Sequence, residues 1–249
     1  MKKILLISGH KEKDNYSKVT NVYEGRINID LIKRIAVKLN PYARVVVYPV
    51  DRDYYKDNKN GIVNSDYNFS KYDYIYEQHA NAGGGTGTCC QIHSNYKKGT
   101  SVEKLISNNL SKLGLRLRGT AGIVRRNDLL NMNTALKKGV DYCLNEAFFY
   151  DNPKDLSIYH SNPDAMAEAI ANGIIDGFGL TIVNHPQGVV TNCTSLNVRR
   201  KPNGEVAFTI PNGSVVTKVG EDKDNDGDSW DRITCKKGGG YVWGRYIKY

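Results

Sequence analysis

The chain has 249 residues, of which 40% are hydrophobic and 24% charged, and its mean hydropathy is -0.51. These values predict a globular protein with one large core and a smaller module, and they exclude a membrane-spanning one, because no apolar run approaches the roughly 20 residues that a spanning helix needs. The net charge of +9 favours a polyanionic partner, but the excess is spread as +3 over residues 186–249 and +6 over the rest, and the lack of a basic arm weakens a nucleic-acid interpretation.

The first residues and the cysteines both indicate where the protein works. Met1 to Ile7 resembles a signal peptide, but Ser8-Gly9-His10 ends the apolar run short of the usual ~7 to 15 residues. The five cysteines are an odd number without a Cys-x-x-Cys pair, which predicts reduced thiols. We therefore expect a protein that is made and kept in the cytoplasm unless another process releases it.

Residues 1–180 alternate between strand and helix patterns. Strands are predicted at Lys3 to Ser8, Arg44 to Tyr48, Tyr72 to Ala82, Thr120 to Val124 and Val140 to Leu144. Helices are predicted at Glu24 to Leu39, Thr100 to Leu113, Leu129 to Lys138 and Asn162 to Phe178, with a capping box joining Thr100 and Glu103. The polar stretch from Asp51 to Ser70 is expected to form loops. This alternation is typical of an α/β domain with a mostly parallel twisted sheet flanked by helices.

Residues 188–249 have no helical period. Short valine-rich segments alternate there with turns such as Pro202-Asn203-Gly204 and Asn212-Gly213-Ser214. This pattern predicts a small all-β open barrel, which a linker at residues 181–187 joins to the first domain.

Two histidines stand at strand ends. His10 directly follows the first strand, and His79 lies near the end of the strand that leads into the glycine run Gly83–Gly87. Sites in open α/β sheets lie at the carboxyl ends of strands, so these imidazoles can converge. Glu24, which is otherwise a helix-start acid, completes a set of two histidines and one glutamate that suits a single catalytic zinc ion.

Four separated motifs occur in a characteristic order: Ser8-Gly9-His10, Glu24 at the first helix, His79-Ala80-Asn81-Ala82, and Glu146 at the last strand. Over residues 1 to about 178 the chain thereby resembles the zinc-dependent N-acetylmuramoyl-L-alanine amidases of type 3. The resemblance implies that His10, Glu24 and His79 bind Zn2+ and that Glu146 is the catalytic acid/base. Without it, Glu146 is equally well a strand-end acid paired with Lys137 or Lys138.

The chain also departs from that family. Lys11-Glu12-Lys13 stands where glycines often follow the first histidine, and Ala147 replaces a common glycine. Glu77-Gln78 replaces a common Ser-Ile pair. Because Glu77 and His79 share one face of a strand, Glu77 is either a rival ligand or a partner that orients an imidazole, and Glu24 ranks ahead of it as a ligand.

Other residues near the predicted site are assigned more simply. Asn81, Arg125 and Arg126 are candidate substrate-binding residues, although exposed arginines are common. The glycine run lacks the Gly-Lys-Ser/Thr ending of a phosphate loop and is expected to be a mobile loop beside the site. The remaining histidines are expected to be solvated: His93, His160 and His185.

The tail, residues 188–249, resembles bacterial SH3-type wall-binding domains through Leu196-Asn197-Val198-Arg199-Arg200, Asn212-Gly213-Ser214 and Gly240-Tyr241-Val242-Trp243. Aromatic side chains suit a groove for peptides or sugars, although core packing is the alternative for at least half of them. The candidate wall-binding residues are Trp230, Tyr241, Trp243 and Tyr246.

Together these resemblances imply a peptidoglycan hydrolase of the phage endolysin type that cleaves the amide between N-acetylmuramic acid and L-alanine. Its partners would be bacterial peptidoglycan and associated wall polymers, with no nucleic acid and no membrane insertion. It would accumulate in the host cytoplasm and act on the wall after release; export to the wall is the alternative. A zinc peptidase that cuts the stem peptide and a non-catalytic wall-binding protein are the other candidate functions.

Overall fold

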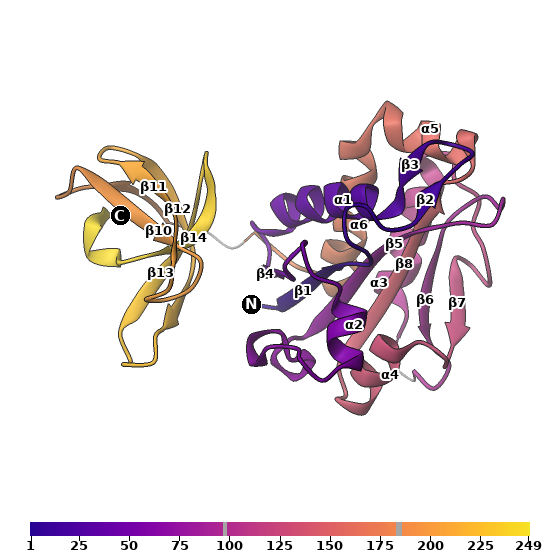
Figure 1. Cartoon of the computed structure of the whole chain (residues 1–249), viewed down its shortest axis with the longest axis horizontal. Helices are drawn as coiled ribbons and strands as arrows, with labels where there is room; N and C mark the ends of the chain where they lie inside the picture. The colour runs from indigo at the N-terminus through magenta and orange to yellow at the C-terminus, as the bar shows by residue number, and fades with distance from the viewer. Residues whose placement is uncertain (97–98, 183–185) are drawn as a thin grey trace. The chain divides into compact units, whose positions relative to one another are not determined.

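The computed structural model describes residues 1–96, 99–182 and 186–249. They form two compact units, Met1–Thr181 and Ile182–Tyr249 (Figure 1). The predicted linker, residues 181–187, includes positions 183–185, which lie outside the described residues together with the prediction for His185. No helix in the described ranges is both long and apolar enough to cross a membrane.

The first unit is organised around a six-stranded sheet with the order β4-β1-β5-β8-β6-β7. Its strands are β1 (Lys3–Ser8), β4 (Arg44–Val47), β5 (Tyr74–Asn81), β6 (Cys89–His93), β7 (Ile123–Arg126) and β8 (Asp141–Phe149). Neighbouring strands are parallel except β6 and β8, which are antiparallel. A small hairpin of β2 (Tyr16–Ser17) and β3 (Val22–Tyr23) precedes the first helix. The predicted α/β class is confirmed.

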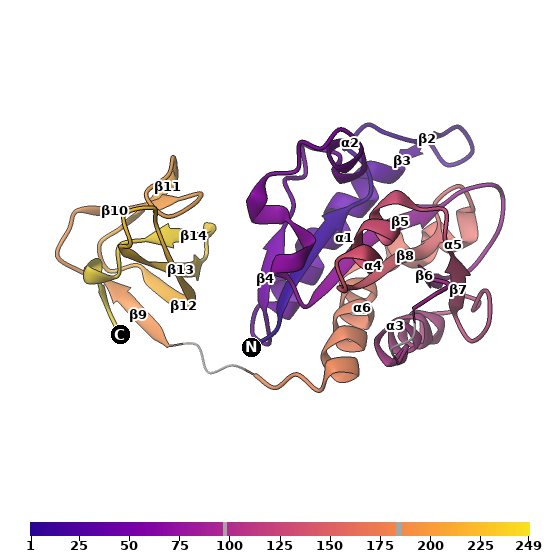
Figure 2. The ribbon, with the colours of Figure 1, turned by 90° about the horizontal axis from the view of Figure 1, so that it is seen from below.

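Helices cover both faces of this sheet (Figures 1 and 2). The helices are α1 (Glu24–Leu39), α2 (Tyr54–Lys59), α3 (Ser101–Lys112), α4 (Leu130–Lys137), α5 (Pro153–Ser161) and α6 (Pro163–Phe178). In β1, Ile4 and Leu6 join the core beneath α1, α3 and α6, whereas Leu5 and Ile7 join the core beneath α2 and α4. The strand is therefore apolar on both faces, as expected for a central parallel strand.

The predicted stripe of α1 is confirmed, since Ile27, Leu31, Ile35 and Leu39 are all buried. Asn162 caps α6 as predicted: its side chain accepts a hydrogen bond from the Ala165 amide.

Several local predictions were wrong. Strand β6 and helices α2 and α5 were not predicted, and β8 runs on to Phe149, so that Glu146 lies within the strand rather than at its end. The capping box does not form: the Thr100 side chain caps no amide of the described residues, and Glu103 is turned into the core, where its Oε1 accepts a 3.1 Å hydrogen bond from the Tyr74 hydroxyl. Burial against the sheet thus overrides the local capping pattern.

The second unit has the predicted all-β character. Its antiparallel sheet curls into a half-barrel and follows the order β11-β10-β14-β13-β12-β9-β15. The strands are β9 (Gln187–Val190), β10 (Ser195–Arg199), β11 (Val206–Pro211), β12 (Val215–Lys223), β13 (Ser229–Cys235), β14 (Gly238–Val242) and β15 (Ile247–Lys248). Its core is made of alternate aliphatic residues of these strands, among them Val198, Val216 and Ile233.

Candidate metal centre

The structure brings His10, Glu24 and His79 together at the carboxyl ends of β1 and β5. One ligand atom from each lies within 4.8 Å of the others. The Nε2 atom of His10 is 3.3 Å from Glu24 Oε2, and the Nδ1 atom of His79 is 3.2 Å from Glu24 Oε1. The two imidazole centroids are 5.0 Å apart and the rings are nearly perpendicular, at 87°. Both imidazoles therefore meet one carboxylate.

Two glycines make this approach possible. Gly9 lies directly beneath His79, and a Cβ atom on Gly9 would be 2.3 Å from the imidazole ring. Its amide donates a 2.9 Å hydrogen bond to the Gln78 carbonyl, which continues the pairing of β1 with β5. Gly25, in the first turn of α1, has the Lys11 carbonyl at 1.6 Å from where its Cβ would be. A side chain at either position would push the ligand-bearing segments apart.

Glu24 is held as a buried carboxylate. Its Oε2 accepts a 2.7 Å hydrogen bond from Asn15, and its Oε1 accepts 3.1 Å bonds from Asn28 and the Ala80 amide. Burial raises the pKa of Glu24, but the hydrogen bond to His79 and the nearby imidazoles outweigh it and lower the pKa to about 2. The group is therefore an anion over the whole physiological range.

The electrostatics favour a cation at this point. Burial lowers the pKa of His10 below its usual value, which leaves the imidazole neutral with a lone pair. Burial also disfavours the charged form of His79, but the carboxylates of Glu24 and Glu77 outweigh it and raise the pKa of His79. The imidazole of His79 therefore holds a proton between two carboxylates, and a metal ion would displace that proton; with the neutral imidazole of His10 and the Glu24 carboxylate this gives a donor set that zinc accepts.

A second group of possible ligands shares His10 with the first. It consists of His10, Asp14 and Asp53, whose ligand atoms also lie within 4.8 Å of one another. Asp53 is engaged elsewhere, since its carboxylate caps α2 at the Lys56 amide (3.0 Å) and pairs with the Lys56 ammonium (3.3 Å). The set that includes Glu24 is therefore the stronger candidate.

Glu77 contacts His79 on the side away from Glu24. Its Oε1 is 3.1 Å from His79 Nε2, and its Oε2 accepts hydrogen bonds from Tyr142 (2.6 Å) and Asn131 (2.9 Å). Of the two roles considered for Glu77, this geometry favours the partner that orients the imidazole, because its oxygens are already engaged and turn the Nδ1 atom of His79 toward Glu24.

Glu146 lies directly beside His79, as its register partner on the neighbouring strand β8. Its Oε1 accepts a 3.4 Å hydrogen bond from Gln91, while its Oε2 is buried and has no hydrogen-bond partner among the described residues. Neither Lys137 nor Lys138 forms an ion pair with it within the described ranges. Burial raises the pKa of Glu146, although His79 and two arginines oppose this.

The candidate substrate-binding residues make contacts within the protein. The Asn81 side chain accepts a 2.9 Å bond from the Ala82 amide. Arg125 donates to the carbonyl oxygens of His93 (3.5 Å) and Tyr96 (3.2 Å). Arg126 forms two bonds to Asp128, at 2.9 and 2.6 Å, and one to Gln91 at 3.3 Å.

Two further predictions concern histidines. His93 was expected to be solvated but is buried in β6, where its Nδ1 accepts a 2.9 Å bond from the Asn95 amide. His160 is exposed, as predicted, on α5. The error at His93 follows from the missed strand.

The glycine run is hydrogen-bonded to two aspartates. The amides of Gly83 and Gly84 donate to Asp151 Oδ2, at 2.7 and 2.9 Å. The Gly87 amide and the Thr86 hydroxyl donate to Asp155, both at 2.7 Å. The mobility expected from the glycines is thus opposed by two carboxylates that flank the start of α5.

Sequence reasoning missed the residues that support Glu24, Glu77 and Glu146: Asn15, Asn28, Asn131 and Gln91. The one available signal was Gln91, a lone amide inside the apolar run Cys89–His93. A polar side chain in a buried strand needs a hydrogen-bonding partner.

In the second unit, the four aromatic candidates are largely engaged with their own neighbours. Trp230, only 6% exposed, stacks on Trp243 with centroids 5.7 Å apart and ring planes 7° apart. Arg245 lies 3.9 Å from the centroid of the Trp243 ring. The Tyr241 hydroxyl donates to Asp222 at 3.0 Å, and Tyr246 packs against the core. Trp243, at 37% exposed, is the more exposed of the two tryptophans.

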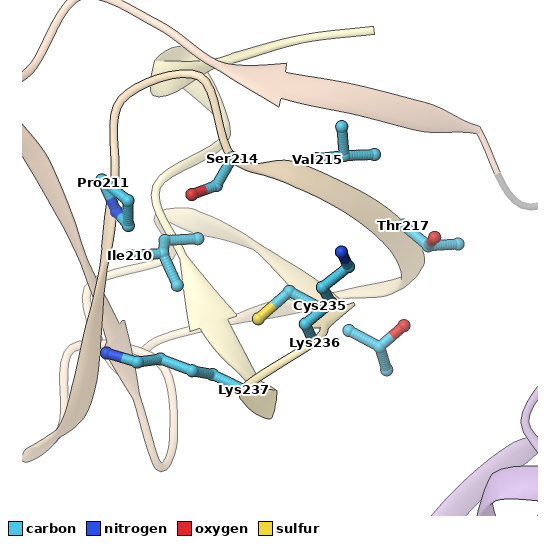
Figure 3. A pocket seen from close by; sticks show the side chains of 9 residues that line it. Ile210, Pro211, Ser214, Val215, Thr217, Cys235, Lys236 and Lys237 are labelled. Carbon is cyan, nitrogen blue, oxygen red and sulfur yellow. The ribbon is translucent and has the colours of Figure 1, made fainter.

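A pocket of about 610 Å³ lies elsewhere on this unit, at the ends of β11, β12 and β13 (Figure 3). It is lined by Ile210, Pro211, Ser214, Val215, Thr217, Thr234, Cys235, Lys236 and Lys237. The lining contains two lysines and no carboxylate. The rest of the lining is mainly apolar, and the Lys237 ammonium donates a 3.1 Å hydrogen bond to the Thr209 carbonyl.

Comparison with known proteins identifies relatives of the first unit. The family model described as N-acetylmuramoyl-L-alanine amidase matches residues 4–176. The probable autolysin PH of Staphylococcus aureus is 29% identical over 195 residues, which are 70% of this chain but only 38% of that protein. An N-acetylmuramoyl-L-alanine amidase from Clostridium difficile 630 has a TM-score of 0.57 at 24% identity, covering 72% of this chain and 97% of the other.

The catalytic domain of the CD27L endolysin, which targets Clostridia difficile, has a TM-score of 0.57 at 23% identity and covers 71% of this chain and 98% of the other. At these identities the structural similarities show a shared fold.

Proposed function

The chain belongs to the N-acetylmuramoyl-L-alanine amidase family, and from this membership we propose that it is a zinc-dependent peptidoglycan hydrolase that cleaves the amide between N-acetylmuramic acid and L-alanine. The observation that carries the proposal is the convergence of His10, Glu24 and His79 beside Glu146. It combines a zinc donor set with an acid, one oxygen of which has no partner among the described residues.

In this proposal His10, Glu24 and His79 would hold one zinc ion, since two histidines and one glutamate are an established ligand set for catalytic zinc. When bound, zinc supplies the acidification of a water molecule and the polarisation of the amide carbonyl. Glu77 keeps the imidazole of His79 in place through the contact to Nε2.

Glu146 transfers the proton. Its Oε2 atom, which lacks a protein partner among the described residues, accepts a proton as water attacks the amide carbonyl, and then returns it to the departing nitrogen of L-alanine. A buried carboxyl with a raised pKa suits both halves of this cycle, since it must gain and lose the proton at similar cost. Asn81 remains the candidate contact to substrate.

For the second unit we propose an SH3-like wall-binding domain over residues 188–249, with a catalytic domain at 1–180 and a linker at 181–187. Two features support binding to anionic wall polymers: the exposed edge of Trp243 beside Arg245, and the pocket with Lys236 and Lys237. A phage endolysin that is released from the host cytoplasm to the wall is the proposed setting.

Digestion of purified peptidoglycan tests the function. Newly exposed amino groups should belong to L-alanine, should disappear with EDTA and should return with zinc. Glu146→Gln should keep bound metal and the melting temperature but lose about 10²- to 10⁴-fold in kcat, the usual contribution of a general acid/base. Glu168→Gln is the matched control, because this carboxylate is 61% exposed on α6.

The same digestion separates the alternatives. A stem-peptide peptidase would expose a different amino terminus. A non-catalytic wall-binding protein would bind the wall without cutting any bond, with or without EDTA, and either outcome would overturn the amidase proposal. A nucleic-acid-binding protein would instead retain DNA with a steep dependence on salt.

A further inference from the structure

A series of polar contacts leads from the surface to Glu146. Asp128 pairs with Arg126 through two bonds, at 2.9 and 2.6 Å. The Nη1 atom of Arg126 donates to Gln91 Oε1 at 3.3 Å, and Gln91 Nε2 donates to Glu146 Oε1 at 3.4 Å. These contacts account for one oxygen of Glu146 and leave the other without a partner among the described residues.

The sheet register brings Arg126, Gln91 and Glu146 to one face of the sheet. Strand β6 pairs in antiparallel fashion with β8, where Gln91 is opposite Leu144 and Cys89 is opposite Glu146. Gln91 is therefore the diagonal neighbour of Glu146, a separation that long side chains bridge. On the other edge β6 pairs with β7, which carries Arg126.

The orientation of the Gln91 amide follows from its partners. A guanidinium has only donors, so Gln91 must turn its oxygen toward Arg126. Its NH₂ group then faces Glu146, where it can donate to a carboxylate. Without Arg126 only the Glu146 carboxylate would orient the amide, so the Gln91 side chain would be held less tightly in place. Gln91 is only 5% exposed, so water offers little alternative partnership.

We propose that Gln91 is a positioning residue for Glu146, and that Arg126 acts through Gln91 rather than on the substrate. The inference rests on the proposed role of Glu146 as acid/base. Gln91 holds Oε1 in place, so that Oε2 is the oxygen that exchanges the proton. Arg126, anchored by Asp128, sets the direction in which Gln91 donates.

A double-mutant cycle tests this proposal on the full chain. Gln91→Met keeps the shape of the side chain but removes the donor, and should lower kcat about 10- to 100-fold with KM within about twofold, as for other residues that orient reacting groups. Arg126→Met should cause a smaller loss in kcat. The kcat of the double variant should be no lower than that of Gln91→Met alone, because both changes break the same series of contacts.

Arg34→Met is the matched control. Arg34 is also paired with carboxylates, at 2.9 Å to Asp30 and 2.9 Å to Asp164, and lies on α1 and away from Gln91. It should leave kcat unchanged. The activity of the wild-type protein tests the proposed function, whereas the kcat ratios among the variants test the role of Gln91. The proposed function and this inference can therefore fail separately.

Crystal structures of both variants add a readout that does not depend on turnover. The Glu146 carboxylate should leave its wild-type position in Gln91→Met, and the Gln91 side chain should show raised displacement or a second rotamer in Arg126→Met. Wild-type kcat in Gln91→Met, or an unmoved Glu146 carboxylate there, would overturn the proposal. A second result would also overturn it: a raised KM in Arg126→Met, with losses in kcat/KM that multiply in the double variant. That result would indicate that Arg126 contacts the substrate directly.

Discussion

Glu103 gives the first unit a stability that depends on pH. This side chain is 2% exposed, at the start of α3, and burial raises its pKa from 4.5 to about 7. The unfolded chain releases the proton near pH 4.5, whereas the folded unit keeps it until about pH 7. Between these values the folded state binds more protons, so stability falls as the pH rises and the loss is complete above about pH 7.

Replacing Glu103 with glutamine should remove this loss. At about 1.4 kcal/mol per pKa unit, the cost reaches about 3 kcal/mol above neutral pH. Glutamine keeps an oxygen for the 3.1 Å hydrogen bond from Tyr74 and has no charge to bury. Glu103→Gln should therefore match the wild type at pH 4 and exceed it by about 3 kcal/mol at pH 8.

Urea unfolding at pH 4 and pH 8 measures the effect. Circular dichroism at 222 nm follows the first unit, which holds all six described α-helices. Fluorescence follows the second unit, which holds both tryptophans, Trp230 and Trp243. With a slope of about 2 kcal/mol per molar urea, the first transition should move up by roughly 1.5 M at pH 8 only.

Two controls and two refuting outcomes decide this reasoning. The fluorescence transition should not move, and the exposed control Glu168→Gln should stay within about 0.5 kcal/mol of wild type at both pH values. An equal change at pH 4 and pH 8, or a less stable Glu103→Gln at pH 8, would refute the burial argument.

Three further predictions concern the site. Gly9→Ala should weaken zinc affinity about 10- to 100-fold, because the new methyl group would lie 2.3 Å from the His79 ring; zinc titration of the metal-free protein measures this, and unchanged affinity would contradict it. Asp155→Ala should destabilise the first unit by about 2 to 4 kcal/mol, because the buried amides of Gly87 and Phe149 lose their acceptor. Asp151→Ala, with exposed partners, should cost less, and equal urea midpoints would argue against the difference. EDTA should stop peptidoglycan digestion and zinc should restore it; digestion that persists in EDTA would exclude the metal.

The parts of the site that lie at element boundaries could be predicted from sequence. His10 follows an apolar run, Glu24 begins a helix with a clear four-residue repeat, and His79 precedes a glycine run. Each signal is local, and the rule that sites form at the carboxyl ends of parallel strands then brings the three together.

The supporting contacts could not be predicted in this way. The apolar run Cys89–His93 has no alternation, because β6 is buried on both faces, and nothing local shows that it runs antiparallel to β8. The partnership of Gln91 with Glu146 depends on that register. Glu103 likewise matched a capping box in sequence, yet its carboxyl is drawn into the core by the packing of α3 on the sheet.

The glycine run leaves one neighbouring position open to substitution. Gly83 and Gly84 are tied to Asp151 by main-chain amides, which every non-proline residue possesses. The exposed Ala82 contributes only its own amide, to Asn81. Its methyl group takes no part in these hydrogen bonds, so a larger side chain can replace it directly after the strand that carries His79 while the frame of the loop stays intact.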